Sequence, residues 1–249
     1  MSPRLDAALA ERGLARSRSH AQQLIADGAV TVNGVPVIKA SHPVSEHDEL
    51  RVSADDHYVS RAAAKLIAAL DAFPVPVDGV FALDAGASTG GFTQVLLERG
   101  ARSVLALDVG HGQLAPSIRN DDRVIVVEGE NVRSLDATRV RHLSGGTELP
   151  RLVVADLSFI SLELVLPALV SASTADAEFV VLIKPQFEVG RGGIREGIVR
   201  DADARADAVE RVLWSAHDLG LRTAGLERSP LLGGHGNIEI LAWLSHQSG

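Results

Sequence analysis

The sequence VFALDAGASTGGFTQVLLERG, residues 80–100, decides the fold of this chain. A short apolar run ends at Asp84, and a glycine-rich turn follows it. An amphipathic helix is then predicted from about Thr89 to Arg99, ending at Gly100. Strand, tight turn and helix in this order make half of a βαβ unit. Such a turn leaves backbone N–H groups free at the helix start, so it favours electron-rich ligand groups.

Four kinds of binding or catalytic site use such turns. The residue types in this turn distinguish some of these sites but not all. A dinucleotide turn would need a second glycine where Ser88 stands, and a P-loop would need lysine where Phe92 stands. The letters of residues 86–90, GASTG, match the G-x-S-x-G elbow of serine hydrolases. They also fit the loop of S-adenosylmethionine (SAM)-dependent methyltransferases, where small residues let the backbone approach the cofactor.

Composition limits the other possibilities. The 249 residues are 46% hydrophobic and include no cysteine, which excludes disulfides and thiolate chemistry. The N-terminus lacks an apolar signal core, and no apolar run approaches the ~18 residues of a membrane span, so a cytoplasmic protein without membrane contact is expected. The net charge is −8, but residues 1–40 carry +2 and the remainder carries −10.

The N-terminal fifty residues are predicted to form a small unit of their own. Two short helices come first, broken near Gly13 and ending at Gly28. Apolar residues then alternate around Asn33-Gly34, a strong signal for a two-residue hairpin. Arg16 and Arg18 lie at the start of the second helix, where arginine suits contacts with phosphate.

After the glycine turn, strands and helices alternate. Apolar runs end at Asp108, Val127, Asp156 and Lys184, and residues 202–219 form a long predicted helix. This rhythm predicts an α/β fold, a doubly wound and mostly parallel sheet with ligands at the carboxyl ends of its strands.

Charged residues fall at those strand ends. Asp84, Asp108, Asp156 and Lys184 each end a strand, and Glu239 lies in the last apolar run. A charge inside a buried strand is costly unless it is paired. Their convergence at one edge therefore indicates a site.

The N-terminal segment resembles the S-four-type RNA-binding module over nearly all of residues 3–53. The resemblance rests on residues 4–6 (RLD), 13–18 (GLARSR), 21–25 (AQQLI) and 28–34 (GAVTVNG). It implies binding to structured RNA, with Arg4, Arg16, Arg18 and Lys39 as the RNA-binding residues.

Over the whole chain, the sequence resembles the TlyA (haemolysin A) family, which is similar to FtsJ-like ribose methyltransferases. The motifs are YVSR (58–61), DAGASTGGFT (84–93), ADLSFIS (155–161), KPQFEVG (184–190) and GNIE (236–239). The resemblance implies a Rossmann-like methyltransferase that uses SAM, and no metal, to methylate the 2′-hydroxyl of cytidine in ribosomal RNA. The implied catalytic residues are Lys65, Asp156, Lys184 and Glu239. The implied cofactor-binding residues are Asp84, Gly86, Ala87, Ser88, Thr89, Gly90, Gly91 and Asp108.

This resemblance divides the chain into an RNA-binding domain (1–54), a linker (55–60) and a methyltransferase domain (61–249). The sequence stops soon after Trp243, which favours the short subtype of the family and hence large-subunit ribosomal RNA as substrate, free or within the subunit. Two other functions remain open at this point. One is a non-enzymatic ribosome-binding protein, and the other is a serine hydrolase that uses Ser88, Asp156 and His235.

Lysine usage carries a further hint. The chain has only three lysines, Lys39, Lys65 and Lys184, against 21 arginines. A buried lysine can give up its proton, whereas arginine cannot. We therefore expect Lys184 to be the general base and Lys65 its electrostatic partner.

Overall fold

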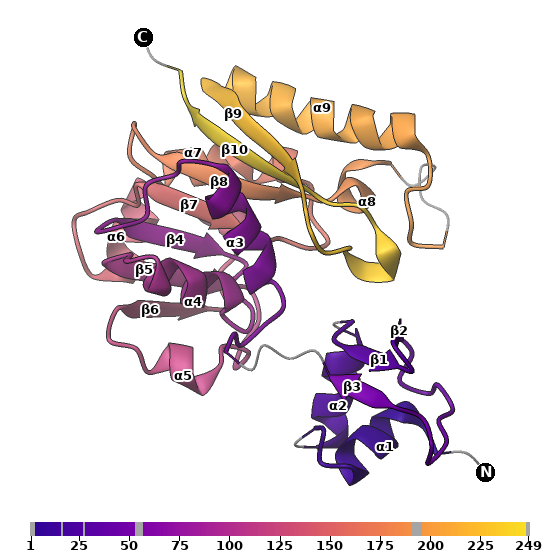
Figure 1. Ribbon diagram of the computed structural model, residues 1–249. Helices are drawn as coiled ribbons and strands as arrows, with labels where there is room; N and C mark the ends of the chain where they lie inside the picture. Colours follow the sequence, from indigo (N-terminus) through magenta and orange to yellow (C-terminus); the bar gives the residue numbers. More distant parts are fainter. Residues whose placement is uncertain (1–2, 16, 27, 53–56, 191–195, 248–249) are drawn as a thin grey trace. The chain divides into compact units, whose positions relative to one another are not determined.

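A computed structural model describes residues 3–15, 17–26, 28–52, 57–190 and 196–247, and the chain divides into two compact units (Figure 1). The first unit is Met1–Arg61 and the second is Ala62–Gly249. Each has its own hydrophobic core, as expected for parts that fold around separate apolar clusters.

The first unit packs two helices against a small antiparallel sheet. The helices are α1 (Leu5–Glu11) and α2 (Arg18–Ala26), and the strands are β1 (Val30–Val32), β2 (Val35–Pro36) and β3 (Leu50–Val52), in the order β2-β1-β3. Asn33 and Gly34 both have positive φ, 52° and 79°, as a two-residue turn between β1 and β2 requires. The predicted hairpin is therefore present.

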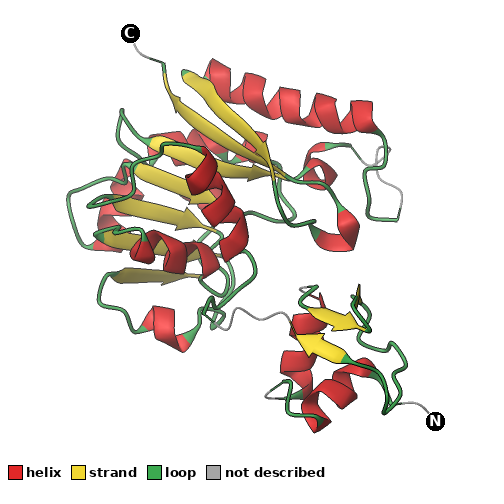
Figure 2. Cartoon of the chain, in the orientation of Figure 1, coloured by secondary structure: helices red, strands yellow, loops and turns green. Residues whose placement is uncertain are grey.

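The second unit is built on a seven-stranded sheet (Figure 2). Its strands are β4 (Phe81–Ala85), β5 (Ser103–Asp108), β6 (Val124–Glu128), β7 (Leu152–Ala155), β8 (Glu178–Ile183), β9 (Leu221–Arg228) and β10 (Ile240–His246). Their order is β6-β5-β4-β7-β8-β10-β9, with β4 to β8 parallel and β10 antiparallel to both of its neighbours. The predicted doubly wound, mostly parallel α/β fold is confirmed.

Helices cover both faces of this sheet (Figure 1). They are α3 (Ala63–Ala72), α4 (Gly91–Glu98), α5 (Pro116–Arg119), α6 (Ala137–Ser144), α7 (Leu166–Ser171), α8 (Pro185–Glu188) and α9 (Ala202–Asp218). Along β10, Ala242 and Leu244 join the core cluster to which α6, α7 and α9 contribute. Trp243, between them, stacks on Phe73 just after α3, with ring centroids 5.9 Å apart. Successive strand residues point to opposite faces, so α3 and α9 lie on different sides of the sheet.

The strand order reverses direction at β4, whose neighbours are β5 on one side and β7 on the other. In open α/β sheets, ligands bind beyond the carboxyl ends of the strands at such a switch point. Because β10 runs antiparallel to β8, its beginning lies at this same edge, with Ile240 paired to Ile183. Four chain segments therefore converge there, namely those after β4, β7 and β8 and the one before β10.

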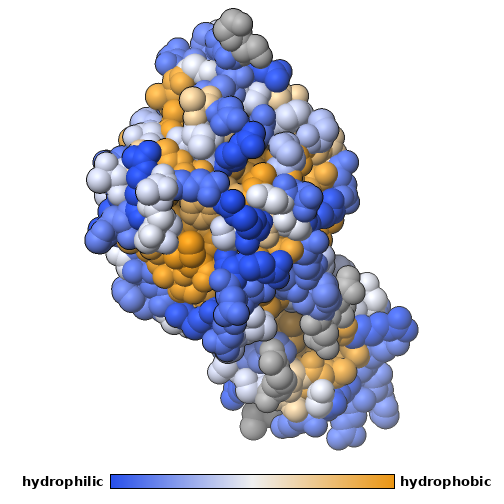
Figure 3. Space-filling view, turned by 90° about the vertical axis from the view of Figure 1, so that its left-hand side faces the viewer, coloured by the Kyte–Doolittle hydropathy of each residue, from blue (hydrophilic) through white to orange (hydrophobic). Residues whose placement is uncertain are grey.

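The exposed large apolar side chains come from several separate parts of the sequence. They include Val35, Ile38, Val109, Phe159, Leu164 and Trp214. On the face drawn in Figure 3, hydrophilic residues surround separate apolar patches. Within the described ranges, no helix has the length and apolar character needed to cross a membrane.

Candidate active site

The loop after β4 is shaped by close backbone packing. Gly86 and Gly90 have φ of +88° and +96°, a region that favours glycine. A Cβ on Gly86 would lie 2.9 Å from the backbone oxygen of Asp156, and one on Gly90 would lie 2.9 Å from Leu114 Cδ1. Ser88 also has positive φ, 48°. The backbone angles and close contacts of this loop therefore require small residues. The start of a helix alone would not require them.

Asp84 lies beneath the loop. Its side chain is fully buried, and Oδ2 accepts a 2.6 Å hydrogen bond from Thr93 Oγ1 in α4. Burial raises the pKa of Asp84 to about 7. Oδ1 has no partner among the described residues. Asp84 thus ties the end of β4 to α4, and its cofactor contact stays a prediction.

Asp108, at the end of β5, holds the loop from its side. One carboxylate oxygen, Oδ2, accepts from Ser88 N at 2.8 Å, and Oδ1 accepts from Gly110 N at 2.7 Å. The Ser88 hydroxyl donates to Gln113 Oε1 at 3.2 Å. Each carboxylate oxygen has further lone pairs, so Asp108 can accept additional hydrogen bonds from a ligand bound over the loop.

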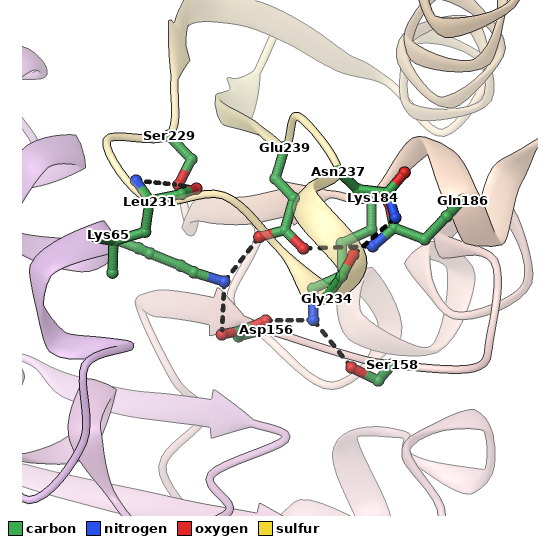
Figure 4. A network of polar contacts seen from close by, with 10 residues as sticks. All are labelled: Lys65, Asp156, Ser158, Lys184, Gln186, Ser229, Leu231, Gly234, Asn237 and Glu239. Atoms are coloured by element: carbon green, nitrogen blue, oxygen red, sulfur yellow. Dashed lines mark hydrogen bonds and ion pairs between the residues drawn. The ribbon is translucent and has the colours of Figure 1, made fainter. Parts of the chain in front are cut away.

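Four charged side chains meet at the same edge of the sheet, and we call them the Lys–Asp–Lys–Glu cluster: Lys65, Asp156, Lys184 and Glu239 (Figure 4). Lys65 Nζ, from α3, donates to Glu239 Oε2 at 2.7 Å and lies 3.7 Å from Asp156 Oδ2. Lys184 Nζ lies 2.6 Å from Asp156 Oδ1. All four residues predicted to be catalytic are thus brought together.

The sheet register explains this convergence. Asp156 follows β7, which pairs in parallel with β4 and ends at Ala155 opposite Ala85. Lys184 follows β8, and the antiparallel pair Ile183–Ile240 brings Glu239 to the same level. Lys65, Lys184 and Glu239 are only 6%, 7% and 2% exposed. Each of these three side chains lies within ion-pair distance of an opposite charge, which makes its burial tolerable, and the side chain of Asp156 is 14% exposed.

Three further side chains hold the cluster, and sequence reasoning did not single them out. Ser158 Oγ accepts from Lys184 Nζ at 2.9 Å, and Gln186 Nε2 lies 3.4 Å from Glu239 Oε1. Asn237 donates to the carbonyls of Gly197 and Gly234 and accepts from Val199 N, which fixes the loop before Glu239. Ser158, Gln186 and Asn237 lie within two residues of cluster members, and this proximity was the signal available in the sequence.

The other predicted cofactor-binding residues, Ala87, Thr89 and Gly91, lie in the loop after β4 and at the start of α4, whereas the predicted RNA-binding residues lie in the first unit. Arg4 and Arg18 both contact the buried carboxylate of Asp6, and Lys39 is exposed on the segment before Ala40. Arg16 lies outside the described residues. In the described part of the chain, no group of three or more His, Cys, Asp or Glu residues is arranged to hold a metal ion.

The hydrolase alternative is wrong. The hydrogen bonds of the described residues join Ser88 Oγ to Gln113, and the ion pairs join Asp156 to two lysines. None of them joins Ser88 or Asp156 to His235, whose ring lies beside Gly197. In the part of the chain that the structure describes, these hydrogen bonds thus do not join Ser88 to the histidine base that the predicted triad would need.

This sheet order, loop and charged cluster define a protein of the Rossmann-like methyltransferase class. The family profile of FtsJ-like methyltransferases matches residues 58–246, and that of the S4 domain matches residues 3–50. The chain belongs to the TlyA family, whose methyltransferase part is FtsJ-like. The resemblance predicted from the sequence motifs is confirmed.

Three relatives illustrate this membership. The chain is 50% identical to the 16S/23S rRNA (cytidine-2′-O)-methyltransferase TlyA of Mycobacterium tuberculosis, over 98% of this chain and 90% of the relative. It is 35% identical to the 23S rRNA (cytidine-2′-O)-methyltransferase TlyA of Campylobacter jejuni, over 73% of this chain and 68% of that protein. A solved structure from Streptococcus thermophilus, described as a hemolysin, aligns with a TM-score of 0.78 at 39% identity and covers 100% of this chain and 90% of its own.

Proposed function

We propose that this protein binds SAM at the loop of residues 86–91 and transfers its methyl group to the 2′-hydroxyl of a cytidine in ribosomal RNA. The observation that carries the proposal is the buried, charge-balanced Lys–Asp–Lys–Glu cluster beside a glycine-rich loop at the carboxyl edge of the sheet. A ribose hydroxyl is a weak nucleophile until its proton is removed, and the cluster offers amines for that task.

The loop fits SAM in two respects. Gly86 and Gly90 leave no room for a side chain, so the backbone itself would form the floor beneath the cofactor. Asp108 keeps free lone pairs beside this floor and would accept hydrogen bonds from the ribose hydroxyls of SAM. When bound, SAM supplies a methyl group on a positively charged sulfur, which makes that methyl group electrophilic.

Lys184 is the proposed general base. Its Nζ lies 2.6 Å from Asp156 Oδ1 and 2.9 Å from Ser158 Oγ. In its unprotonated form Nζ would accept the proton of the 2′-hydroxyl as the oxygen takes the methyl group from the sulfur, whose bond to the methyl carbon breaks. Lys65, whose Nζ lies 3.7 Å from Asp156 Oδ2, would act as the electrostatic partner of Lys184. Glu239 keeps Lys65 in place at 2.7 Å.

The proposed substrate follows from what the two relatives have in common. The M. tuberculosis relative is named for both 16S and 23S ribosomal RNA and the C. jejuni relative for 23S alone, so 23S ribosomal RNA is shared. We therefore propose a cytidine of large-subunit RNA as the target, in agreement with the expectation from the sequence.

RNA binding falls, in this proposal, to the first unit, with Arg4, Arg16, Arg18 and Lys39 as its cations. The proposed boundaries are residues 1–54 for the RNA-binding domain and 61–249 for the methyltransferase domain. The match of an S4 domain to residues 3–50 and the net charge of +2 over residues 1–40 support this division of labour.

The test uses tritiated SAM with separated 23S and 16S RNA and with isolated ribosomal subunits. The expected result is methyl incorporation at one cytidine of 23S RNA, and ribose analysis should place the methyl group on the 2′ oxygen. A label on the base would contradict the proposed chemistry. RNA binding without any incorporation would instead support the non-enzymatic alternative.

A further inference from the structure

The first unit contains a buried carboxylate with an unusual number of donors. Asp6 is fully buried in α1, and Oδ1 accepts from Arg4 Nε and from Ala7 N, both at 3.0 Å. Oδ2 accepts from Arg4 Nη2 at 3.1 Å, from Arg18 Nε at 3.0 Å and from Gln22 Nε2 at 2.7 Å. The hydrogen bonds from Arg4, with those from Gln22 and Arg18, hold the pKa of Asp6 well below its ordinary range.

The two arginines keep their outer atoms accessible. The side chains of Arg4 and Arg18 are 48% and 56% exposed, although both guanidiniums contact a carboxylate with no exposure. The bond from Arg18 uses Nε, which leaves its two Nη groups outside the pair with Asp6. Two nitrogens of one guanidinium form the fork that binds phosphate oxygens in a bidentate manner.

A third cation belongs to a neighbouring segment. The backbone N–H of Asp6 donates to the carbonyl of Ala40 at 3.1 Å, and Lys39 immediately precedes Ala40. Asp6 is thus the point at which the start of α1, the first turn of α2 and the segment of Lys39 meet. The single negative charge of Asp6 is contacted by two guanidiniums, so the net charge of these three side chains is positive.

We propose that Asp6 is a positioning residue that fixes Arg4 and Arg18 as a preformed receptor for the phosphate backbone of RNA. This inference rests on the proposed function, since it assigns RNA as the ligand of the first unit. Ordering a long side chain on binding costs affinity, and a carboxylate that holds both guanidiniums beforehand removes that cost. Asp6 itself touches no RNA in this arrangement.

The test compares two variants with the same change of charge. Asp6→Asn and Glu49→Gln each remove one negative charge from the first unit, and Glu49 pairs with Arg51 at 2.8 Å rather than with Arg4 or Arg18. General attraction to RNA would make both variants bind more tightly. Our proposal gives the opposite sign for Asp6→Asn, namely a rise of about tenfold in the KM for ribosomal RNA. Its kcat and SAM affinity should stay unchanged, and Glu49→Gln should show an equal or lower KM.

The salt dependence of RNA binding gives a second measurement. It would stay unchanged if Asp6 served only to stabilise the fold. The slope of log K against log salt should decrease by about one for Asp6→Asn, because at least one ordered phosphate contact is lost. Arg18→Lys covers the case in which Asp6→Asn fails to fold. It keeps the charge but lacks the guanidinium fork, and it should raise KM while the thermal unfolding temperature stays constant.

An unchanged KM and salt slope in folded Asp6→Asn, or wild-type RNA affinity in Arg18→Lys, would overturn the inference. Failure of the proposed function looks different, because the wild-type protein would then methylate no ribosomal RNA. In that case filter binding of ribosomal RNA to the wild type and to Asp6→Asn still decides the role of Asp6.

Discussion

The two lysines of the Lys–Asp–Lys–Glu cluster differ in what holds them. Lys65 donates to Glu239 and lies farther from Asp156, at 3.7 Å, whereas Lys184 contacts Asp156 at 2.6 Å and Ser158 at 2.9 Å. Lys184 also extends directly from the end of β8, in the crevice where a ligand is expected. Lys65 Nζ thus lies near two carboxylates and Lys184 Nζ near one. This difference favours Lys184 as the group that exchanges a proton with the substrate.

We therefore predict that Lys184→Arg lowers the methyl-transfer rate by ~10²–10⁴-fold, because arginine keeps the charge but cannot act as a base. Affinities for SAM and RNA should change little. Single-turnover methylation measures the rate, and Ser158→Ala is the matched control, since it removes a contact of Lys184 but keeps the amine and should cost less than about tenfold. A rate near that of the wild type for Lys184→Arg would leave this residue with a role in positioning alone.

Asp84 gives a prediction about pH. Burial raises its pKa to about 7, whereas an unfolded aspartate titrates near 4. Between these values the folded state retains a proton that the unfolded state has lost, so this residue makes stability fall as pH rises from about 4 to about 7. Asp84→Asn should remove this contribution.

Urea unfolding of the wild type and Asp84→Asn at pH 5 and pH 8 provides the measurement. The stability of the variant relative to the wild type should increase by about 1–3 kcal/mol between the two pH values. Asp71→Asn, which removes a surface partner of Arg99, controls for the loss of one negative charge. Parallel pH curves for the wild type and Asp84→Asn would mean that Asp84 is ionised in the folded protein throughout.

At the level of elements, the loop between β4 and α4 depends on a position where no side chain fits. We predict that Gly86→Ala lowers the free energy of unfolding by about 2–4 kcal/mol, because its φ is +88° and its Cβ would press on the backbone of Asp156. Gly112→Ala is the matched control, since its φ is +65° but nothing lies within 4 Å of the added Cβ. It should lose only about 1–2 kcal/mol.

Urea unfolding measures both glycine variants, and calorimetry measures their affinity for SAM. SAM affinity should fall for Gly86→Ala, because the shifted loop is the proposed cofactor floor. Equal losses of stability in the two variants would show that backbone conformation alone, and not the approach of Asp156, demands glycine at this loop.

The positions of most helices and strands could be predicted from the sequence, because apolar periodicity and glycine signals are local. Residues 202–219 were expected to be helical, and α9 spans Ala202–Asp218. The predicted helix at Thr89 begins instead at Gly91, because Gly90 adopts left-handed backbone angles. Between β7 and β8, a 3₁₀ turn, Leu162–Leu164, precedes α7, whose second residue is Pro167.

The contacts of the site were harder to predict. Charges at strand ends predicted that Asp156 and Lys184 would lie at one edge, because parallel strands end together. The distance between Lys65 and Glu239 depends on the register of β10 against β8, which no local signal in the sequence reveals. The donors around Asp6 were likewise missed, since a single aspartate near a helix start has no pattern that marks it as buried.

For the whole molecule, the division into two units predicts separable functions. The fragment Ala62–Gly249 contains the complete Lys–Asp–Lys–Glu cluster and its own core, so we expect it to bind SAM within about threefold of the full chain. It should lose methylation of ribosomal RNA, because residues 62–249 hold 17 Lys and Arg against 24 Asp and Glu, and this net charge of −7 repels a polyanion.

Calorimetry with SAM and tritium incorporation into ribosomal RNA measure the two properties of this fragment. The fragment Met1–Arg61 serves as the complement and should bind the RNA with a strong dependence on salt. Methylation by Ala62–Gly249 with the KM of the full chain would place the RNA-binding surface in the second unit.

The position of β10 has a consequence for the order of events during protein synthesis. β10 is made after β9 but is inserted between β9 and β8, and Glu239 comes 174 residues after its partner Lys65. A nascent chain that has emerged only as far as β9 can form the glycine-rich loop after β4, yet Lys65 still lacks the carboxylate of Glu239 and the sheet lacks an interior strand. Long-range pairing of this kind is slow because loop closure must precede it. If the Lys–Asp–Lys–Glu cluster is catalytic, as proposed, a chain still being translated should be inactive until β10 has docked, although the ribosome that makes it contains the RNA it is proposed to modify.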